Sequence, residues 1–214
     1  MKKRNVKVVL SLLVVLFIAI GTFFVHWTWK YYQLPMLPDN SKYENLAERA
    51  VAARKVAKQM GLSDKYCLLV DYSLPSGTPR MFVWSFDEWR VVARTYVMHG
   101  PGKGSTDEKP VFSNKFGSNC SSLGRFAVTH EHGNRNKTGY YIRGLDMDNQ
   151  SARGRGLMIH RSRWVDVNCW REYIPLNAKC CLGCYTVSSR GMDYIGKLVD
   201  GEKKQILLWS FCSE

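Results

Sequence analysis

Residues 66–84 read YCLLVDYSLPSGTPRMFVW, and this stretch decides the class of fold that we predict. Two apolar runs, 66–72 and 80–84, flank a turn that holds Pro, Ser and Gly, which is the pattern of two short strands joined by a turn. A third apolar run covers residues 89–98, and the close spacing of the three runs indicates a meander. From residue 65 onward the chain therefore begins as a β structure.

Short β-like runs continue to the end of the chain. They lie at residues 125–129, 139–143, 156–160, 184–187 and 205–211, and residues 189–198 fit one short helix. Strands dominate, and they do not alternate with helices as they do in a βαβ protein. We therefore predict a mainly β fold over residues 62–214, an antiparallel β-sandwich or a partly closed barrel with a few short helices.

The first 30 residues form a separate apolar segment. Four basic residues between positions 2 and 7 precede an apolar run over residues 8–25, and roughly 18 helical residues span ~27 Å, about one hydrocarbon core. Aromatic residues follow where the membrane interface would lie: Trp27, Trp29, Tyr31 and Tyr32. The end of the run lacks the small residues of a cleavage site. We predict an uncleaved, single-pass signal-anchor over residues 1–30, with the N-terminus in the cytoplasm.

Residues 31–61 connect this segment to the β-rich part. Pro35 and Pro38 block regular pairing, so the stretch around them is predicted to be a linker. Ser41 and Glu44 have the spacing of a capping box, and apolar residues then recur at helical intervals up to Gly61. The sequence predicts an amphipathic helix here, docked on the following domain.

Composition argues against several classes of protein. Hydrophobic residues make up 45% of the 214 residues, too many for a disordered chain. The net charge is +13, but the first 60 residues hold ten basic and only three acidic side chains, so about half of the excess precedes the β-rich domain. No zinc-finger spacing or aromatic RNA-binding motif accompanies the charge, and we expect no nucleic-acid partner.

The sequence KCCLGCYT at residues 179–186 is the most informative for chemistry. Gly183 precedes Cys184, and a glycine lets backbone N–H groups approach a substrate carbonyl, where they can hold an oxyanion. A thiol acts as a nucleophile only as the thiolate, so it needs a base beside it. The best candidate is His160, which ends the apolar run RGLMIH at residues 155–160.

The order of these blocks resembles the L,D-transpeptidase catalytic domain (the YkuD-like family), in particular its murein L,D-transpeptidase branch. That family has a strand with a histidine followed by a Ser/Thr-x-Gly-Cys signature, which correspond here to His160 and residues 181–184. The sequence SSLGRF at residues 121–126 is similar to an upstream element of the branch, as are residues 112–118 and 144–155. The resemblance covers roughly residues 65–212. Cys181 and Leu182 depart from the signature, where the family has Ser/Thr and often a second histidine.

The resemblance implies a cysteine-dependent enzyme of the bacterial cell wall. Cys184 would be the nucleophile, His160 the general base, and the backbone of Gly183 and Cys184 the oxyanion pocket. The thiol would form a thioester with one peptidoglycan stem peptide and pass it to a second, which makes a cross-link; water in place of the second stem would give L,D-carboxypeptidase activity. No metal or organic cofactor is needed. With the anchor, this places the catalytic domain in the periplasm, attached to the inner membrane.

Two other functions stay open from the residues alone. His130, His132, Cys181 and Cys184 include ligand types for zinc, and the spacing of the two cysteines suits a metal site. The altered signature also fits a non-catalytic wall-binding module. The chain has seven cysteines, an odd number for an exported protein, and a disulfide between Cys169 and Cys180 or Cys181 is one expected pairing.

Four arginines are candidates for gripping substrate carboxylates, although a solvated basic rim is the expected role for most of them. They are Arg125, Arg143, Arg153 and Arg155.

Overall fold

The computed structural model describes residues 2–32, 44–133 and 139–212 of the 214-residue chain. Its contacts divide the chain into two units, Met1–Gln33 and Leu34–Glu214. Pro35, Pro38 and Ser41, on which the predicted linker and helix cap rest, lie outside the described residues.

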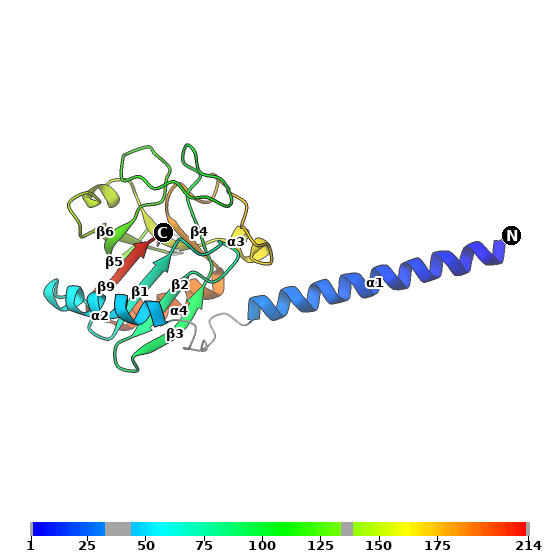
Figure 1. Ribbon diagram of the computed structural model, residues 1–214, viewed down its shortest axis with the longest axis horizontal. Helices are drawn as coiled ribbons and strands as arrows, with labels where there is room; N and C mark the ends of the chain where they lie inside the picture. The colour runs from blue at the N-terminus through cyan, green and yellow to red at the C-terminus, as the bar shows by residue number, and fades with distance from the viewer. Residues whose placement is uncertain (1, 33–43, 134–138, 213–214) are drawn as a thin grey trace. The chain divides into compact units, whose positions relative to one another are not determined.

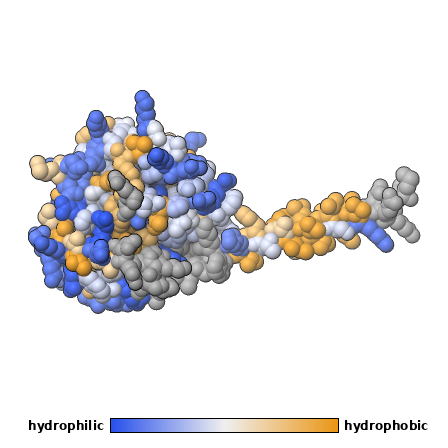
Figure 2. Space-filling model, in the orientation of Figure 1, coloured by the Kyte–Doolittle hydropathy of each residue, from blue (hydrophilic) through white to orange (hydrophobic). Residues whose placement is uncertain are grey.

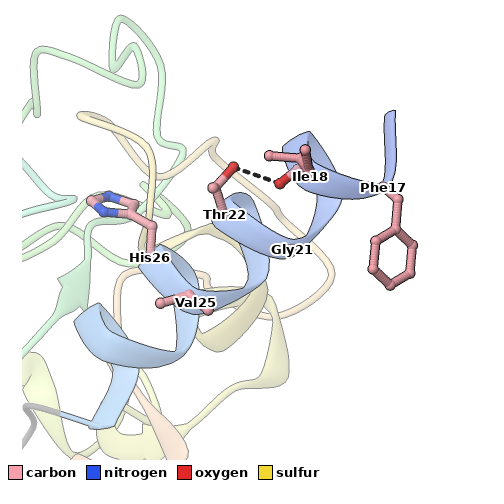
Figure 3. Close-up of a pocket in the computed structure, with 6 residues that line it drawn as sticks. All are labelled: Phe17, Ile18, Gly21, Thr22, Val25 and His26. Atoms are coloured by element: carbon pink, nitrogen blue, oxygen red, sulfur yellow. Dashed lines mark hydrogen bonds between the residues drawn. The ribbon is translucent and has the colours of Figure 1, made fainter. Parts of the chain in front are cut away.

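The first unit is one long helix, α1 (Lys2–Tyr32), and the segment Lys7–Thr28 is long and apolar enough to cross a membrane. Figure 2 shows how hydrophobic residues dominate its surface. Figure 3 draws a shallow hollow on this helix, in which the Thr22 hydroxyl donates to the Ile18 carbonyl at 3.0 Å. This bond reduces the cost of placing a hydroxyl in an apolar environment. The helix fits a secretion signal or a membrane anchor.

The second unit is built on one mixed sheet. Within the described residues its nine strands are β1 (Tyr66–Asp71), β2 (Met81–Ser85), β3 (Arg90–Thr95), β4 (Val97–Met98), β5 (Gly124–His132), β6 (Gly139–Gly144), β7 (Met158–Arg161), β8 (Tyr185–Val187) and β9 (Ile206–Phe211). Their order across the sheet is β3-β2-β1-β9-β5-β6-β7-β8-β4 (Figure 1).

The sheet curls into a nearly closed barrel. Its two edge strands, β3 and β4, are consecutive in the chain and only Tyr96 lies between them. The two edges must therefore lie close together, because one residue spans less than 4 Å. The prediction of a partly closed barrel is confirmed, and the alternative of a sandwich of two sheets is wrong, since one continuous sheet surrounds the core.

Two strand pairings are parallel, β1 with β9 and β7 with β8, so the prediction of an antiparallel fold is wrong for these pairs. Parallel neighbours need a crossover connection. The connection from β7 to β8 includes helix α3 (Arg163–Asn168) and the cysteine-rich turn, whereas β1 and β9 come from the two ends of the domain. Alternating apolar residues indicate a strand but not which distant strand it pairs with.

Two apolar clusters lie on the two faces of the sheet. The first takes alternate residues of most strands, such as Phe126 and Ile142, together with Met192 and Ile195 of helix α4 (Ser189–Gly201), and fills the barrel. The second lies under helix α2 (Glu44–Gln59), which crosses β1 and β9 (Figure 1). The structure thus contains the predicted amphipathic helix on the domain and the predicted helix near residue 190.

A third, smaller cluster positions the cysteine-rich turn. Val165 of α3, Ile174 and Cys181 pack against Tyr96 and Met98 beside the β3–β4 edge. Ser162 caps the start of α3 by accepting from the Trp164 N–H at 3.2 Å. The segment between β7 and β8 is therefore held against the outer face of the barrel by apolar packing.

Candidate active site

His160 lies on β7 and is paired in parallel register with Thr186 on β8. Its ring Nδ1 is 3.1 Å from the Arg161 carbonyl oxygen, and its Nε2 is 3.2 Å from the Thr186 hydroxyl. A carbonyl only accepts, so Nδ1 carries the proton and Nε2 accepts from the Thr186 hydroxyl. Neighbouring groups on β7 and β8 thus select one tautomer of His160.

Burial lowers the pKa of His160 below its ordinary value, while the hydrogen bond to the Arg161 carbonyl acts in the opposite direction. The net lowering favours the neutral imidazole. A neutral ring with an unprotonated Nε2 is the form that a general base requires.

Cys184 stands immediately before β8, at the end of a turn that depends on Gly183. Gly183 has a φ of +99°, and a Cβ placed on it would come within 2.4 Å of the Cys120 carbonyl oxygen. Gly100 lies against the same turn, since a Cβ placed on Gly100 would lie 2.8 Å from the Gly183 Cα. Backbone packing therefore requires glycine at position 183. This is a second reason for the glycine, beside the expected access of a substrate carbonyl to the backbone N–H groups.

His160 and Cys184 line the same pocket, whose volume is about 400 Å³. Its walls come from residues 155–160, from the turn over residues 178–184, and from Gly133. The described contacts of the imidazole include Thr186 and Arg161 but no hydrogen bond to the thiol, which is common in substrate-free sites. The structure brings the two predicted residues together across parallel strands.

Two thiols of the turn, those of Cys184 and Cys181, differ in burial and bonding. Burial raises the pKa of Cys184, whereas the Met158 backbone and the Arg155 guanidinium act to lower it. Burial raises the pKa of Cys181 to about 12, and the Cys181 thiol donates to the Cys184 carbonyl oxygen at 3.4 Å. Cys181 therefore makes the internal bond of the turn that a hydroxyl would make at this position.

Arg155 differs from a solvated rim residue, the role expected for most of the four arginines. Its guanidinium is partly buried and bonds to the loop over residues 113–122. Arg153 does lie at the surface, where it pairs with Glu131 and covers the Tyr141 ring at 3.6 Å. Of these four arginines, only Arg155 lines the pocket of Cys184.

The two histidines of the zinc alternative contact groups other than the thiols. His130 is exposed and its Nε2 lies 2.8 Å from the Glu202 carbonyl oxygen, while the His132 ring stacks on Tyr140 with centroids 4.6 Å apart. Over the described residues, no group of three or more potential ligands is arranged to hold a metal ion. The predicted set of His130, His132, Cys181 and Cys184 is therefore not assembled as a metal site in the described part of the chain.

The seven cysteines are thiols and not disulfides in this structure, so the disulfide expected between Cys169 and Cys180 or Cys181 is not formed. Cys169 and Cys181 are buried in the same apolar cluster, with Cys180 packed against it.

The sequence analysis did not identify two residues that contribute to the candidate site, Thr186 and Met158. Thr186 follows Cys184 by two positions, and residues two apart in a strand lie on the same face. This spacing could have indicated Thr186 from the sequence alone. Met158, whose backbone favours the Cys184 thiolate, stands two residues before His160. Its approach to Cys184 depends on the pairing of β7 with β8, for which the sequence carries no local signal.

A family model described as the L,D-transpeptidase catalytic domain matches residues 39–209. No curated protein matches the chain. The chain is similar to the crystal structure of the helical cell shape determining protein Pgp2 from Campylobacter jejuni, with 11% identity, a TM-score of 0.42, and coverage of 71% of this chain and 49% of that one. It thus spans about half the length of Pgp2.

A second solved structure is the L,D-transpeptidase (residues 123–326) from Xylanimonas cellulosilytica, with 14% identity and a TM-score of 0.35. The match covers 73% of this chain and 68% of that one.

Proposed function

This chain belongs to the family of L,D-transpeptidase catalytic domains, and we propose that it is a peptidoglycan L,D-transpeptidase that cross-links stem peptides in the bacterial cell wall. The observation that carries the proposal is the presence of His160 and Cys184 in one pocket, with the histidine tautomer selected for a general base. Cys184 is the proposed nucleophile and His160 the proposed base.

The first step is transfer of the Cys184 proton to Nε2 of His160. Nε2 is occupied by the Thr186 hydroxyl, which has a second acceptor in the Cys180 carbonyl oxygen at 3.5 Å. Rotation of this hydroxyl from Nε2 to the carbonyl frees the lone pair for the thiol proton. The imidazolium that forms keeps its bond from Nδ1 to the Arg161 carbonyl.

The thiolate then attacks the carbonyl carbon of the diamino acid in the donor stem peptide. The C–S bond forms, the carbonyl oxygen becomes an oxyanion, and backbone N–H groups of Cys184 and Gly183 stabilise it, each worth about 3 kcal/mol. Since the Gly183 backbone acts to lower the pKa of the Cys181 thiol, its N–H faces that sulfur, and the Cys184 N–H is the more available donor. The C–N bond to the terminal D-alanine breaks, and its amine leaves with the proton from His160.

A side-chain amine of a second stem peptide resolves the thioester. It attacks the thioester carbon and gives one proton to the neutral His160. The C–S bond breaks as the amide bond forms, and the Cys184 thiolate that leaves takes the proton from His160. Water in the place of this amine would release the shortened stem, and the same site would act as an L,D-carboxypeptidase. Analysis of the products separates the two outcomes.

Helix α1 supports attachment of the enzyme to the membrane. The apolar segment Lys7–Thr28 matches the hydrocarbon core in length. The basic residues before it favour a cytoplasmic N-terminus, so we place the catalytic unit in the periplasm next to its polymer substrate.

The test uses full-length protein in detergent with disaccharide-tetrapeptides, and products are identified by mass spectrometry. We expect dimers that have lost one terminal D-alanine, and none with Cys184→Ala. Cys180→Ala is the matched control, because this thiol lines the same pocket and should not be needed. A folded wild-type protein that binds the polymer and leaves it unchanged would favour the non-catalytic wall-binding module.

A further inference from the structure

Arg155 holds the loop over residues 113–122 with both ends of its guanidinium. Nη1 donates to the Ser113 carbonyl at 2.9 Å and to the Ser122 hydroxyl at 2.6 Å. Nη2 donates to the Cys120 carbonyl at 2.8 Å and to the Ser118 hydroxyl at 3.3 Å. All four acceptors are neutral, so these bonds fix the position of the guanidinium without cancelling its charge.

The same guanidinium lies against the turn that carries Cys184. A Cβ on Gly183 would come within 3.1 Å of Arg155 Nη2 and within 2.4 Å of the Cys120 carbonyl oxygen. Arg155, the Cys120 carbonyl and the Gly183 backbone therefore form one packed layer. Arg155 also lines the pocket of Cys184, and none of the described residues in the walls of this pocket is acidic.

We propose that Arg155 is a positioning residue for Cys184: it fixes the turn at Gly183 through the loop over residues 113–122 and presents an uncancelled positive charge to the thiolate. Both terminal nitrogens are occupied by the protein, so Arg155 does not grip a substrate carboxylate with them. The inference rests on the proposed function in that Cys184 is the nucleophile.

Electrostatics near Cys184 agree with this role. The Arg155 charge lowers the pKa of the Cys184 thiol, against the larger effect of burial, and burial lowers the pKa of Arg155 itself. A charge acts more strongly in a partly buried site than in water. Among the described residues, the other titratable groups near the thiol include His160, Lys179, Cys180, Cys181, Tyr72 and Tyr185.

The first experiment measures the rate of Cys184 alkylation by iodoacetamide as a function of pH, with adducts mapped by mass spectrometry. In Arg155→Met we expect the apparent pKa of the thiol to rise by about one unit, so that alkylation at neutral pH slows about tenfold. Arg155→Lys keeps a positive charge and should stay closer to the wild-type profile. Arg153→Met is the matched control, because this neighbouring arginine is held at the surface by Glu131.

The second experiment measures cross-link formation. Arg155→Lys should lower turnover about tenfold or more. A single ammonium group has three N–H donors, so it cannot replace the four hydrogen bonds that the two terminal nitrogens of the guanidinium make to the loop. An unchanged alkylation profile in Arg155→Met would overturn the electrostatic role, and full turnover in Arg155→Lys would overturn the positioning role. Arg155→Gln, which is neutral but can still hydrogen bond, replaces Arg155→Met if thermal unfolding shows that the latter does not fold.

Alkylation needs no substrate, so it separates this inference from the proposed function. If the wild type makes no cross-links but Arg155→Met still shifts the alkylation profile, the proposed function fails and the effect of Arg155 on Cys184 stands. If the wild type makes cross-links but Arg155→Met does not shift the alkylation profile, the proposed function stands and the effect of Arg155 on Cys184 fails.

Discussion

The Thr186 hydroxyl lies 3.2 Å from Nε2 of His160, the atom proposed to accept the proton of Cys184. The contact follows from the parallel pairing of β7 and β8, which sets these two residues side by side. The hydroxyl donates to the lone pair of the neutral ring, so it stabilises the state that the reaction needs and holds the ring towards the pocket. It also has to leave before the proton can move.

Replacement of Thr186 tests this relationship. Thr186→Val removes the hydroxyl at nearly constant volume, and we expect kcat to fall about fivefold to tenfold because the ring is held less firmly. Without a donor to Nε2 the protonated ring is less disfavoured, so the acid limb of the kcat/KM profile should move to higher pH. Thr186→Ser keeps the hydroxyl and should restore both values; equal profiles for the two variants would contradict the assignment.

Removal of the imidazole should abolish most turnover and spare the fold. We expect His160→Ala to reduce the rate by ~10²–10⁴, with residual activity that rises with pH as the thiol ionises unaided. The cost in unfolding free energy should be ~1 kcal/mol or less. In the wild type, burial lowers the pKa of His160, so the acid limb should lie below pH 6.5.

The control for His160→Ala is His130→Ala, which alters an exposed ring bonded to the Glu202 carbonyl. Near-full activity in His160→Ala together with loss in His130→Ala would show that the base is misassigned.

Cys184 should be the thiol that reacts with electrophiles such as iodoacetamide or a carbapenem. Cys181 is buried, its pKa is raised to about 12, and its thiol is bonded to the Cys184 carbonyl. We expect Cys181→Ser to retain most activity, because a hydroxyl can make the same bond, and Cys181→Val to lose more. Mass mapping of the adduct to Cys180 or Cys181 with Cys184 untouched would refute the choice of nucleophile.

A buried histidine should make stability depend on pH. His99 is fully buried, with Nε2 2.8 Å from the Thr106 carbonyl and Nδ1 3.1 Å from Arg80 Nη2. Burial, aided by the Arg80 charge, lowers the pKa of His99 to about 4. The unfolded chain binds its proton near pH 6.5 and the folded chain does not, so stability is lost as the pH falls from about 6.5 to 4, by on the order of 3 kcal/mol.

Urea unfolding at pH 7.5 and pH 5 measures this effect. His99→Gln should reduce the difference between the two pH values, whereas His130→Gln, at an exposed position, should leave it unchanged. A pH dependence identical in all three proteins would exclude His99 as its source.

The apolar helix should remain on the mature protein. We expect N-terminal sequencing of protein from the native membrane to begin at the start of α1, because residues 21–27 lack the small residues of a cleavage site. A mature N-terminus near residue 30 would refute the anchor, though not export.

Local patterns predicted the elements of the fold but not their pairing. The apolar run at residues 66–72 corresponds to β1, and the helix expected over residues 189–198 corresponds to α4. The neighbours of β9 are β1 and β5, which precede it by more than 70 residues. That arrangement depends on which apolar faces pack together in three dimensions, and the sequence pattern of a strand does not encode it.

The candidate site shows the same division. A histidine at the end of a strand and a thiol after a glycine could be predicted from the sequence, because both signals are local: a run of apolar residues and a Gly-Cys step. The pairing of β7 with β8, the bond between Thr186 and His160, and the approach of Arg155 to the Gly183 turn could be found only in the folded structure. The physical reason is that these contacts join segments far apart in the chain, where burial and backbone packing select the partner.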